Sequence, residues 1–175
     1  MGNPKKIATE AVLINASKQE VWNLLFHRFG ETHLYNPNIE GSHGTNGRKG
    51  EIGCERECSI DRKTNIKERI VNAEEFKSIT VDVIGGNMLM VNEMQVILLV
   101  DPVSSIQTKV SINASYTTKP SFMAGIVKGM FRKMLFGVLI GLKYHLETGN
   151  AVSKKSFKSI SGNFCRLQGS QAFVA

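Results

Sequence analysis

Residues 121–147 read SFMAGIVKGMFRKMLFGVLIGLKYHLE, one long helical segment near the end of a chain that otherwise has the pattern of strands. Successive residues of a helix turn by about 100°, and this spacing gathers one set on the same side: Met123, Val127, Met130, Met134, Val138, Gly141 and His145. Methionine fills irregular space and adapts to changing partners. Because three methionines lie on this side, the segment is predicted to form one wall of a cavity.

The residues before this helix follow the two-residue period of antiparallel strands. Strands are expected at 7–14, 39–42, 51–60, 66–73, 77–84, 89–100 and 106–116. The short turns between them, such as residues 61–65 and 101–102, are typical of an antiparallel meander. Ser17 and Glu20 form a capping box that starts a short helix after the first strand, and a second short helix is expected at 30–35.

These elements predict an α+β fold in which a curved antiparallel sheet of about seven strands wraps around the long C-terminal helix. The two short helices would close one end, leaving room for a ligand between sheet and helix. Residues 1–150 are expected to form a single domain. The tail, residues 151–175, is rich in Ser, Lys, Gly and Gln without a sustained period, and is expected to be mobile or loosely docked.

The order of elements resembles the helix-grip superfamily, which includes START lipid-transfer domains, birch-pollen allergen, plant abscisic-acid receptors and bacterial polyketide cyclase-like proteins. The local likenesses are Ile14-Asn15-Ala16-Ser17 followed by Val21-Trp22, Tyr35-Asn36-Pro37-Asn38-Ile39, Lys67-Glu68-Arg69-Ile70 and Gly85-Gly86. The resemblance covers residues 6–149 and bears on fold more than on function. It implies that binding is commoner than catalysis. The Pro-bearing gate loop of the hormone receptors is not matched, so hormone reception is not carried over.

Two charged residues are expected on an apolar strand face. Ile52, Cys54, Arg56, Cys58 and Ile60 share one face of their strand, as do Ile66, Glu68 and Ile70 of the next. A hairpin through residues 61–65 would bring Arg56 and Glu68 to neighbouring or diagonal positions. Buried charges must be paired or must contact ligand or water. The pair is either a polar anchor in a ligand pocket or, with another register, a pair that reaches solvent at the sheet edge.

The last strand has a clear inner face, whereas the strand before it does not. Ile106, Thr108, Val110, Ile112, Ala114 and Tyr116 alternate and are expected to point inward. In strand 89–100 either the set with Glu93 or the set with Met90, Asn92 and Met94 could face the pocket. Tyr116 would offer a hydroxyl at the mouth or simply pack.

The predicted ligand contacts are Arg56, Glu68, Val110, Ile112, Tyr116, Met123, Val127, Met130, Met134 and Val138. If the protein is an enzyme, the candidates for proton handling are Glu68, Arg56, Tyr116 and His145. His145 is a possible general base or ligand contact, but it is more readily explained as a cap at the end of the apolar stripe.

The other flank of the long helix mixes cations with large apolar groups: Lys128, Arg132 and Lys143 with Phe122, Phe136, Leu139 and Ile140. Cover by the tail, a homodimer interface or contact with a membrane surface would explain this flank. Tail docking or self-association is favoured over membrane contact.

Other features narrow the function classes. The net charge of +7 comes without a nucleic-acid-binding motif, so nucleic acid is not an expected partner. Cys54 and Cys58 would lie about 13 Å apart on a strand, too far for a disulfide, and reduced thiols indicate a cytoplasmic protein. No metal or cofactor is expected, because the sequence lacks a metal cluster, a phosphate loop and a cofactor fingerprint.

The leading hypothesis is a small protein that binds a hydrophobic or amphipathic molecule, lipid-like or polyketide-like, between sheet and helix. The second is a polyketide cyclase-like or dehydratase-like enzyme. The third is a protein-interaction module like the activators of a heat-shock ATPase, which share the fold and would use the basic-apolar helix flank.

Overall fold

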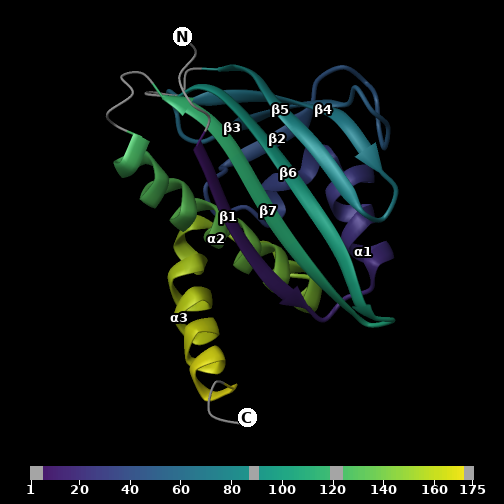
Figure 1. Cartoon of the computed structure of the whole chain (residues 1–175), viewed down its shortest axis with the longest axis vertical. Helices are drawn as coiled ribbons and strands as arrows, with labels where there is room; N and C mark the ends of the chain where they lie inside the picture. Colours follow the sequence, from purple (N-terminus) through teal and green to yellow (C-terminus); the bar gives the residue numbers. More distant parts are fainter. Residues whose placement is uncertain (1–5, 87–90, 119–123, 172–175) are drawn as a thin grey trace.

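The computed structural model describes residues 6–86, 91–118 and 124–171. Within these residues one antiparallel sheet has the order β1-β7-β6-β5-β4-β3-β2. Its strands are β1 (Lys6–Ile14), β2 (Gly41–Gly44), β3 (Glu55–Ser59), β4 (Asn65–Glu74), β5 (Ser78–Gly86), β6 (Val91–Ser104) and β7 (Gln107–Thr118). Strands β2 to β7 form the predicted meander, and β1 joins it at the far edge beside β7 (Figure 1).

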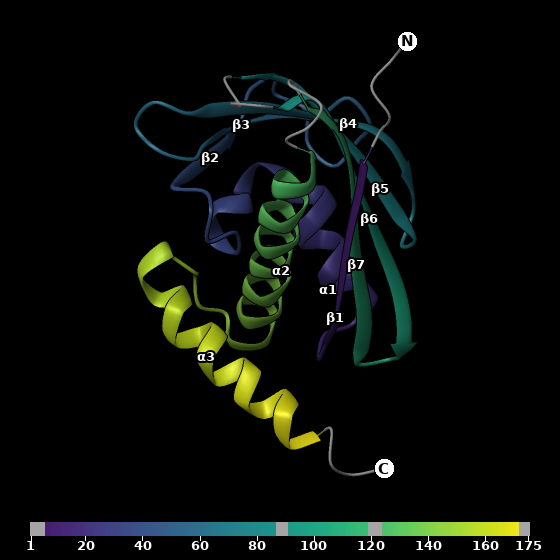
Figure 2. The same cartoon turned by 60° about the vertical axis from the view of Figure 1, so that its left-hand side comes forward.

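The long helix α2 (Ala124–Thr148) lies along the inner side of the curved sheet, as Figure 2 shows. The sheet therefore wraps the helix as the sequence predicts. The face that α2 buries differs from the predicted one. Its most buried side chains are Val127, Phe131, Leu135, Leu139, Ile140 and Leu142, whereas Met130 is half exposed. The predicted stripe of Met130, Met134 and Val138 is displaced to one side of this buried stripe.

This rotation of α2 accounts for its apolar flank. Leu139 and Ile140, predicted to need cover by the tail, a second copy or a membrane, are buried in the hydrophobic core of the chain itself, and Phe136 packs against that core. Phe122 lies outside the described residues. Arg132 pairs with Glu10 of β1 at 2.7 Å, and Lys143 Nζ donates to the Leu13 carbonyl of the same strand. Arg132 and Lys143 thus fix α2 to the edge strand of the sheet.

A short helical segment follows β1 and closes one end of the fold. Helix α1 (Lys18–Trp22) begins with the predicted capping box, in which the Ser17 hydroxyl accepts from the Glu20 amide and the Glu20 carboxylate accepts from the Ser17 amide. The chain continues as a π-helical turn, η1 (Asn23–His27), and a 3-10 helix, η2 (Phe29–Leu34). Their buried residues Trp22, Leu24, Leu25 and Phe29 join the main core.

The inner face of β6 is now defined. Met94 and Val100 are buried, and Val96 and Leu98 pack against the core. The pairing with β7 is irregular between Val91 and Glu93, and Val91 also packs against the core. An irregularity of this kind shifts by one residue the alternation between inward and outward side chains. This shift explains why neither set of alternate residues in the predicted strand 89–100 was cleanly polar. Of the predicted set Met90, Asn92 and Met94, the structure therefore places Met94 inward. Met90 and the side chain of Asn92 lie outside the described residues.

Two residues expected to point inward are exposed. Ile52 precedes β3, because the positive φ of Gly53 ends the turn there and the strand begins only at Glu55. Ile106 lies in the turn between β6 and β7, before β7 begins at Gln107. In both cases the predicted strand was too long at its turn end.

The C-terminal tail contains helix α3 (Lys154–Gln171), which sequence periodicity did not reveal. The Ser153 hydroxyl accepts from the Ser156 amide at the start of the helix. Phe157 and Ile160 pack against the core, and Figure 2 shows α3 crossing beside α2. The docked end is therefore part of the domain's surface, while the expectation of a loosely held tail stays a prediction. No described helix has the length and apolar character needed to cross a membrane.

Candidate ligand cavity

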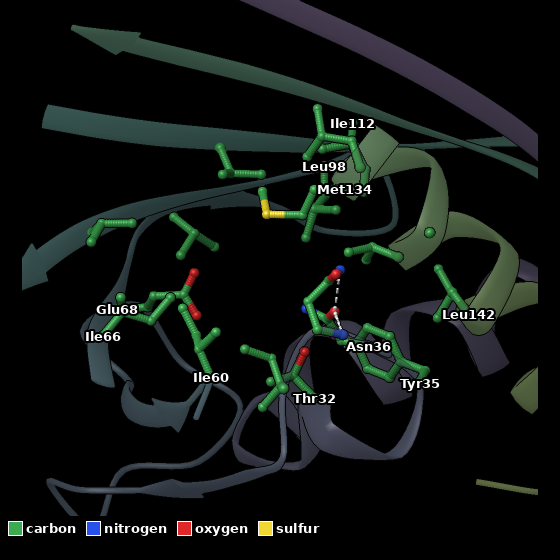
Figure 3. A pocket seen from close by; sticks show the side chains of 18 of the residues that line it. Thr32, Tyr35, Asn36, Ile60, Ile66, Glu68, Leu98, Ile112, Met134 and Leu142 are labelled. Carbon is green, nitrogen blue, oxygen red and sulfur yellow. Dashed lines mark hydrogen bonds between the residues drawn. The ribbon is translucent and has the colours of Figure 1, made fainter. Parts of the chain in front are cut away.

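A cavity of about 500 Å³ lies between the sheet, α2 and η2 (Figure 3). Its polar lining residues are Thr32, Asn36, Asn38, Arg56, Glu68 and Lys133. The remaining lining is largely apolar and includes Leu25, Ile39, Ile60, Ile66, Val81, Val83, Met94, Val96, Leu98, Ile112, Met130, Met134, Leu135, Val138, Leu142 and Phe157. The space is of the size that proteins use for small-molecule ligands, and a few polar groups in an apolar lining are typical of such sites.

The charged pair at the cavity wall is formed by adjacent strands. Arg56 of β3 and Glu68 of β4 are directly opposite each other in the strand register. Arg56 Nε donates to Glu68 Oε2 at 2.6 Å, and the two residues are only 9% and 8% exposed. Of the two arrangements that the sequence left open, this geometry is the inward-facing pair and not a pair that reaches solvent at the sheet edge. The β3–β4 turn fixes the register, so the pair is built by the hairpin itself.

Several further contacts hold Arg56 and Glu68 in place. Arg56 Nη1 donates to the Phe29 carbonyl oxygen at 2.9 Å, and the guanidinium lies 4.0 Å from the centre of the Phe29 ring. The Cys58 thiol lies 3.5 Å from Glu68 Oε2 as a weak donor. The pair is thus tied to η2 as well as to the sheet, which makes it a rigid part of the wall.

Burial sets the protonation of this group. Burial, the largest single influence, would lower the pKa of Arg56, but the opposing interactions, led by the Glu68 carboxylate, together raise this pKa, so the guanidinium stays charged. Burial raises the pKa of Cys58 to about 12, and the positive charge of Arg56 only partly opposes this. Cys58 is therefore a neutral thiol beside an ionic pair, and a nucleophilic role for it is not supported.

Comparisons with known proteins bear on the fold. No family model matches the chain, and no curated protein matches its sequence. Among solved structures, a protein from Thermobifida fusca is 18% identical with a TM-score of 0.68, over 80% of this chain and 92% of that one. A START superfamily protein from Mycobacterium smegmatis is 13% identical with a TM-score of 0.65, over 81% of this chain and 97% of that one.

A third similar structure is truncated norcoclaurine synthase from Thalictrum flavum, 16% identical with a TM-score of 0.67, over 85% of this chain and 96% of that one. The chain has the helix-grip fold. At this level of identity the likeness extends to the fold alone. The norcoclaurine synthase has also been solved in complex with dopamine and hydroxybenzaldehyde.

Six predicted ligand contacts of this helix-grip protein line the cavity: Arg56, Glu68, Ile112, Met130, Met134 and Val138. Val110, Tyr116 and Val127 do not, because they are packed in the hydrophobic core between α2 and the sheet. Met123 lies outside the described residues. The rotation of α2 explains the difference, since Phe131 and Leu135 occupy the direction that the predicted stripe was expected to fill.

Two of the four proton-handling candidates lie away from the cavity. Tyr116 is fully buried against Phe131, with ring centres 4.5 Å apart, and its hydroxyl has no hydrogen-bond partner among the described residues. Burial raises the pKa of Tyr116. His145 Nδ1 lies 2.9 Å from the Asn150 carbonyl oxygen at the end of α2, which agrees with the capping interpretation. Of the four, only Arg56 and Glu68 line the helix-grip cavity.

Sequence reasoning missed the contribution of residues 32–38 and of α3. Asn36 Oδ1 accepts hydrogen bonds from the Asn38 amide and side chain, so Asn36-Pro37-Asn38 forms a turn whose polar groups line the helix-grip cavity. The sequence indicated this segment only as a local likeness to the helix-grip superfamily, without a role in a cavity. Phe157 of α3 also lines the cavity, a role that the unperiodic tail did not indicate.

A glycine lets α2 approach this turn. A Cβ atom on Gly141 would overlap the Tyr35 carbonyl oxygen and contact Pro37, so only glycine permits the observed distance. The described residues contain no group of three or more His, Cys, Asp or Glu side chains that could hold a metal ion.

Proposed function

We propose that the protein binds a hydrophobic or amphipathic small molecule in the cavity between the sheet and α2. The observation that carries the proposal is a cavity of about 500 Å³ whose lining is mainly apolar but includes the buried Arg56–Glu68 pair. Burial of apolar ligand surface is worth ~25 cal/mol per Å² before the costs of ordering. The apolar lining would supply the affinity, and the polar groups would orient the ligand.

The Arg56–Glu68 pair supports binding of an amphipathic ligand over a purely apolar one. Figure 3 shows Glu68 projecting from the sheet into the cavity, opposite the Asn36 side chain and above Thr32. The polar side chains of Glu68, Thr32 and Asn36 therefore lie around the lower part of the cavity in this view, while Leu98, Ile112 and Met134 lie at its top (Figure 3). A ligand with one polar end would match this division.

Binding without catalysis is the proposal that the geometry favours. Catalysis would have to rely on Arg56 and Glu68 alone among the predicted candidates, and both are already engaged with each other. With buried free thiols at Cys54 and Cys58, we expect the protein to work in a reducing compartment such as the cytoplasm.

A cavity-filling variant tests the proposal. Met134→Trp would place a larger side chain in the cavity, and Val103→Trp, at an exposed position of β6, is the matched control. Titration with the fluorescent apolar probe N-phenyl-1-naphthylamine should show saturable binding to the wild type and to Val103→Trp, and a loss of about tenfold or more in affinity for Met134→Trp. Native mass spectrometry of the purified protein should show whether a small molecule copurifies.

Equal probe binding by Met134→Trp and the wild type, with the same melting temperature, would place the binding site elsewhere and refute the proposal. Absence of both probe binding and any copurified molecule would also refute it.

A further inference from the structure

The two buried charges in the cavity wall, those of Arg56 and Glu68, neutralise each other. Arg56 and Glu68 are the two buried charged residues of the described lining, and they are in direct contact. Any singly charged ligand group placed beside them would be a third charge without a buried partner. An unpaired charge removed from water is strongly unfavourable, whereas a neutral polar group needs only a hydrogen bond.

The pair also has a preferred hydrogen-bonding direction. Glu68 Oε2 is occupied by Arg56 Nε and the Cys58 thiol, while Oε1 makes no hydrogen bond with any described residue. The carboxylate points into the cavity (Figure 3). A carboxylate oxygen only accepts hydrogen bonds. A ligand group that contacts it must therefore be a donor, and Thr32 and Asn36 supply further neutral polar groups nearby.

We propose that the cavity selects ligands whose polar end is uncharged and donates a hydrogen bond, such as an alcohol or a phenol. The same site would discriminate against carboxylates and ammonium groups alike, because either ion would be a third charge beside a pair whose charges already neutralise each other. This inference rests on the proposed function and specifies the ligand class of that same cavity.

Lys133 does not change this selection. It lines the cavity from α2 but is exposed to solvent, so an ion pair between its ammonium and a ligand carboxylate would stay hydrated. Such exposed ion pairs contribute little to affinity. A carboxylate held there would leave Glu68 Oε1 without a donor, so the ligand would lose the buried hydrogen bond.

Three ligands with the same ring and different polar groups test the inference: 2-naphthol, 2-naphthoate and 2-naphthylmethylammonium. Isothermal titration calorimetry at pH 7.5 should give a Kd for 2-naphthol at least about tenfold lower than for either ion. Arg69→Ala, which removes an exposed cation outside the cavity lining, should leave this order unchanged.

Variants of the pair should change the order in opposite directions. Glu68→Gln leaves the cation of Arg56 without a counter-charge, so 2-naphthoate should become the tightest ligand. Arg56→Gln leaves the carboxylate, so the ammonium ligand should become the tightest. The double variant Arg56→Gln/Glu68→Gln is neutral again and should restore the preference for 2-naphthol. It also provides the test if one of the single variants does not fold.

The outcomes separate the two proposals. Similar affinities of the wild type for all three ligands, or tightest binding of an ion, would overturn the selection of neutral groups while leaving the cavity as a binding site. An unchanged order in the folded Glu68→Gln variant would also overturn it. If none of the three ligands binds the wild type, the proposed function fails together with this inference.

Discussion

Strands β3 and β4 carry two Arg–Glu pairs on adjacent positions, and the two pairs are in opposite environments. Arg56 is opposite Glu68, and the neighbouring Glu55 is opposite Arg69. Both pairs have an N–O distance of 2.6 Å. The side chain of Arg56 is 10% exposed, however, while that of Arg69 is 45% exposed. Strand alternation alone sends one pair into the cavity and the other into water.

The comparison shows that the distance within an ion pair does not determine its importance. In water the charges of Arg69 and Glu55 are solvated whether or not they touch, so their contact adds little. Inside the cavity wall each charge depends on the other, because neither can regain its water. Identical residue types at the same distance therefore form an exposed surface pair in one case and, in our proposal, a ligand-selecting pair in the other.

Removal of one buried partner should have the largest effect. Glu68→Ala leaves Arg56 charged and unpaired, and we expect the free energy of unfolding to fall by about 4 kcal/mol in urea titrations. A loss below about 1 kcal/mol would mean that cavity water solvates Arg56 as well as bulk water solvates Arg69, and the contrast between the two pairs would disappear.

The reactivity of the Cys58 thiol tests whether the surroundings of the Arg56–Glu68 pair are buried. A pKa of about 12 instead of the ordinary value of 9.0 predicts a thiolate fraction at pH 8 about a thousandfold lower than in the unfolded chain. Iodoacetamide labelling followed by peptide mass spectrometry should show slow modification of Cys58 in the native protein and rapid modification in urea.

The sign of the accompanying pH effect follows from the raised pKa. The folded state holds the proton of Cys58 more tightly than the unfolded state, so this group's contribution to stability is complete below pH 9 and is lost as the pH rises toward 12.

In the labelling experiment, equal rates in native and unfolded protein would contradict the burial of Cys58.

Replacement of both buried charges should have a smaller effect on stability than removal of one. Arg56→Met/Glu68→Met removes both charges and fills the space with apolar groups, and we expect a free energy of unfolding within about 2 kcal/mol of the wild type. Circular dichroism during urea unfolding would measure this. A double variant as unstable as Glu68→Ala would mean that the contacts of Arg56 with Phe29, and not its charge, hold the wall together.

The exposed pair should matter least. Arg69→Ala is expected to change the free energy of unfolding by about 1 kcal/mol or less, and less still in 1 M NaCl, where the charges are screened. The measurement is the same urea titration with and without salt. A loss comparable with that of Glu68→Ala would show that exposure does not separate the two pairs.

The inward pairing of Arg56 and Glu68 was predictable because it depends on local rules. Strand alternation assigned both residues to the apolar face, and the short turn at residues 61–65 fixed their register. The capping box at Ser17 and Glu20 was equally local. The order of strands and the long helix followed from periodicity and turns, which is why the fold as a whole was predicted.

The orientation of α2 was not predictable in the same way. Apolar residues occur on most sides of this helix, so both the stripe with Met134 and the stripe with Leu135 and Leu139 had helical spacing. Packing against β1 and β7 decided between them, and periodicity carries no information about that choice. The inner face of β6 was ambiguous because of its irregular pairing, and α3 because its stability comes from docking of Phe157 and Ile160.

Gly141 influences the dimensions of the cavity, although it does not line it. Its backbone rests on the Tyr35 carbonyl group, and this contact sets how deeply the C-terminal half of α2 sits against the turn at Asn36. Addition of a methyl group would lift that half of the helix outward. Val138 and Met134 of the same helix would withdraw with it, and the cavity would admit larger ligands through a change at a residue of α2 that does not line it.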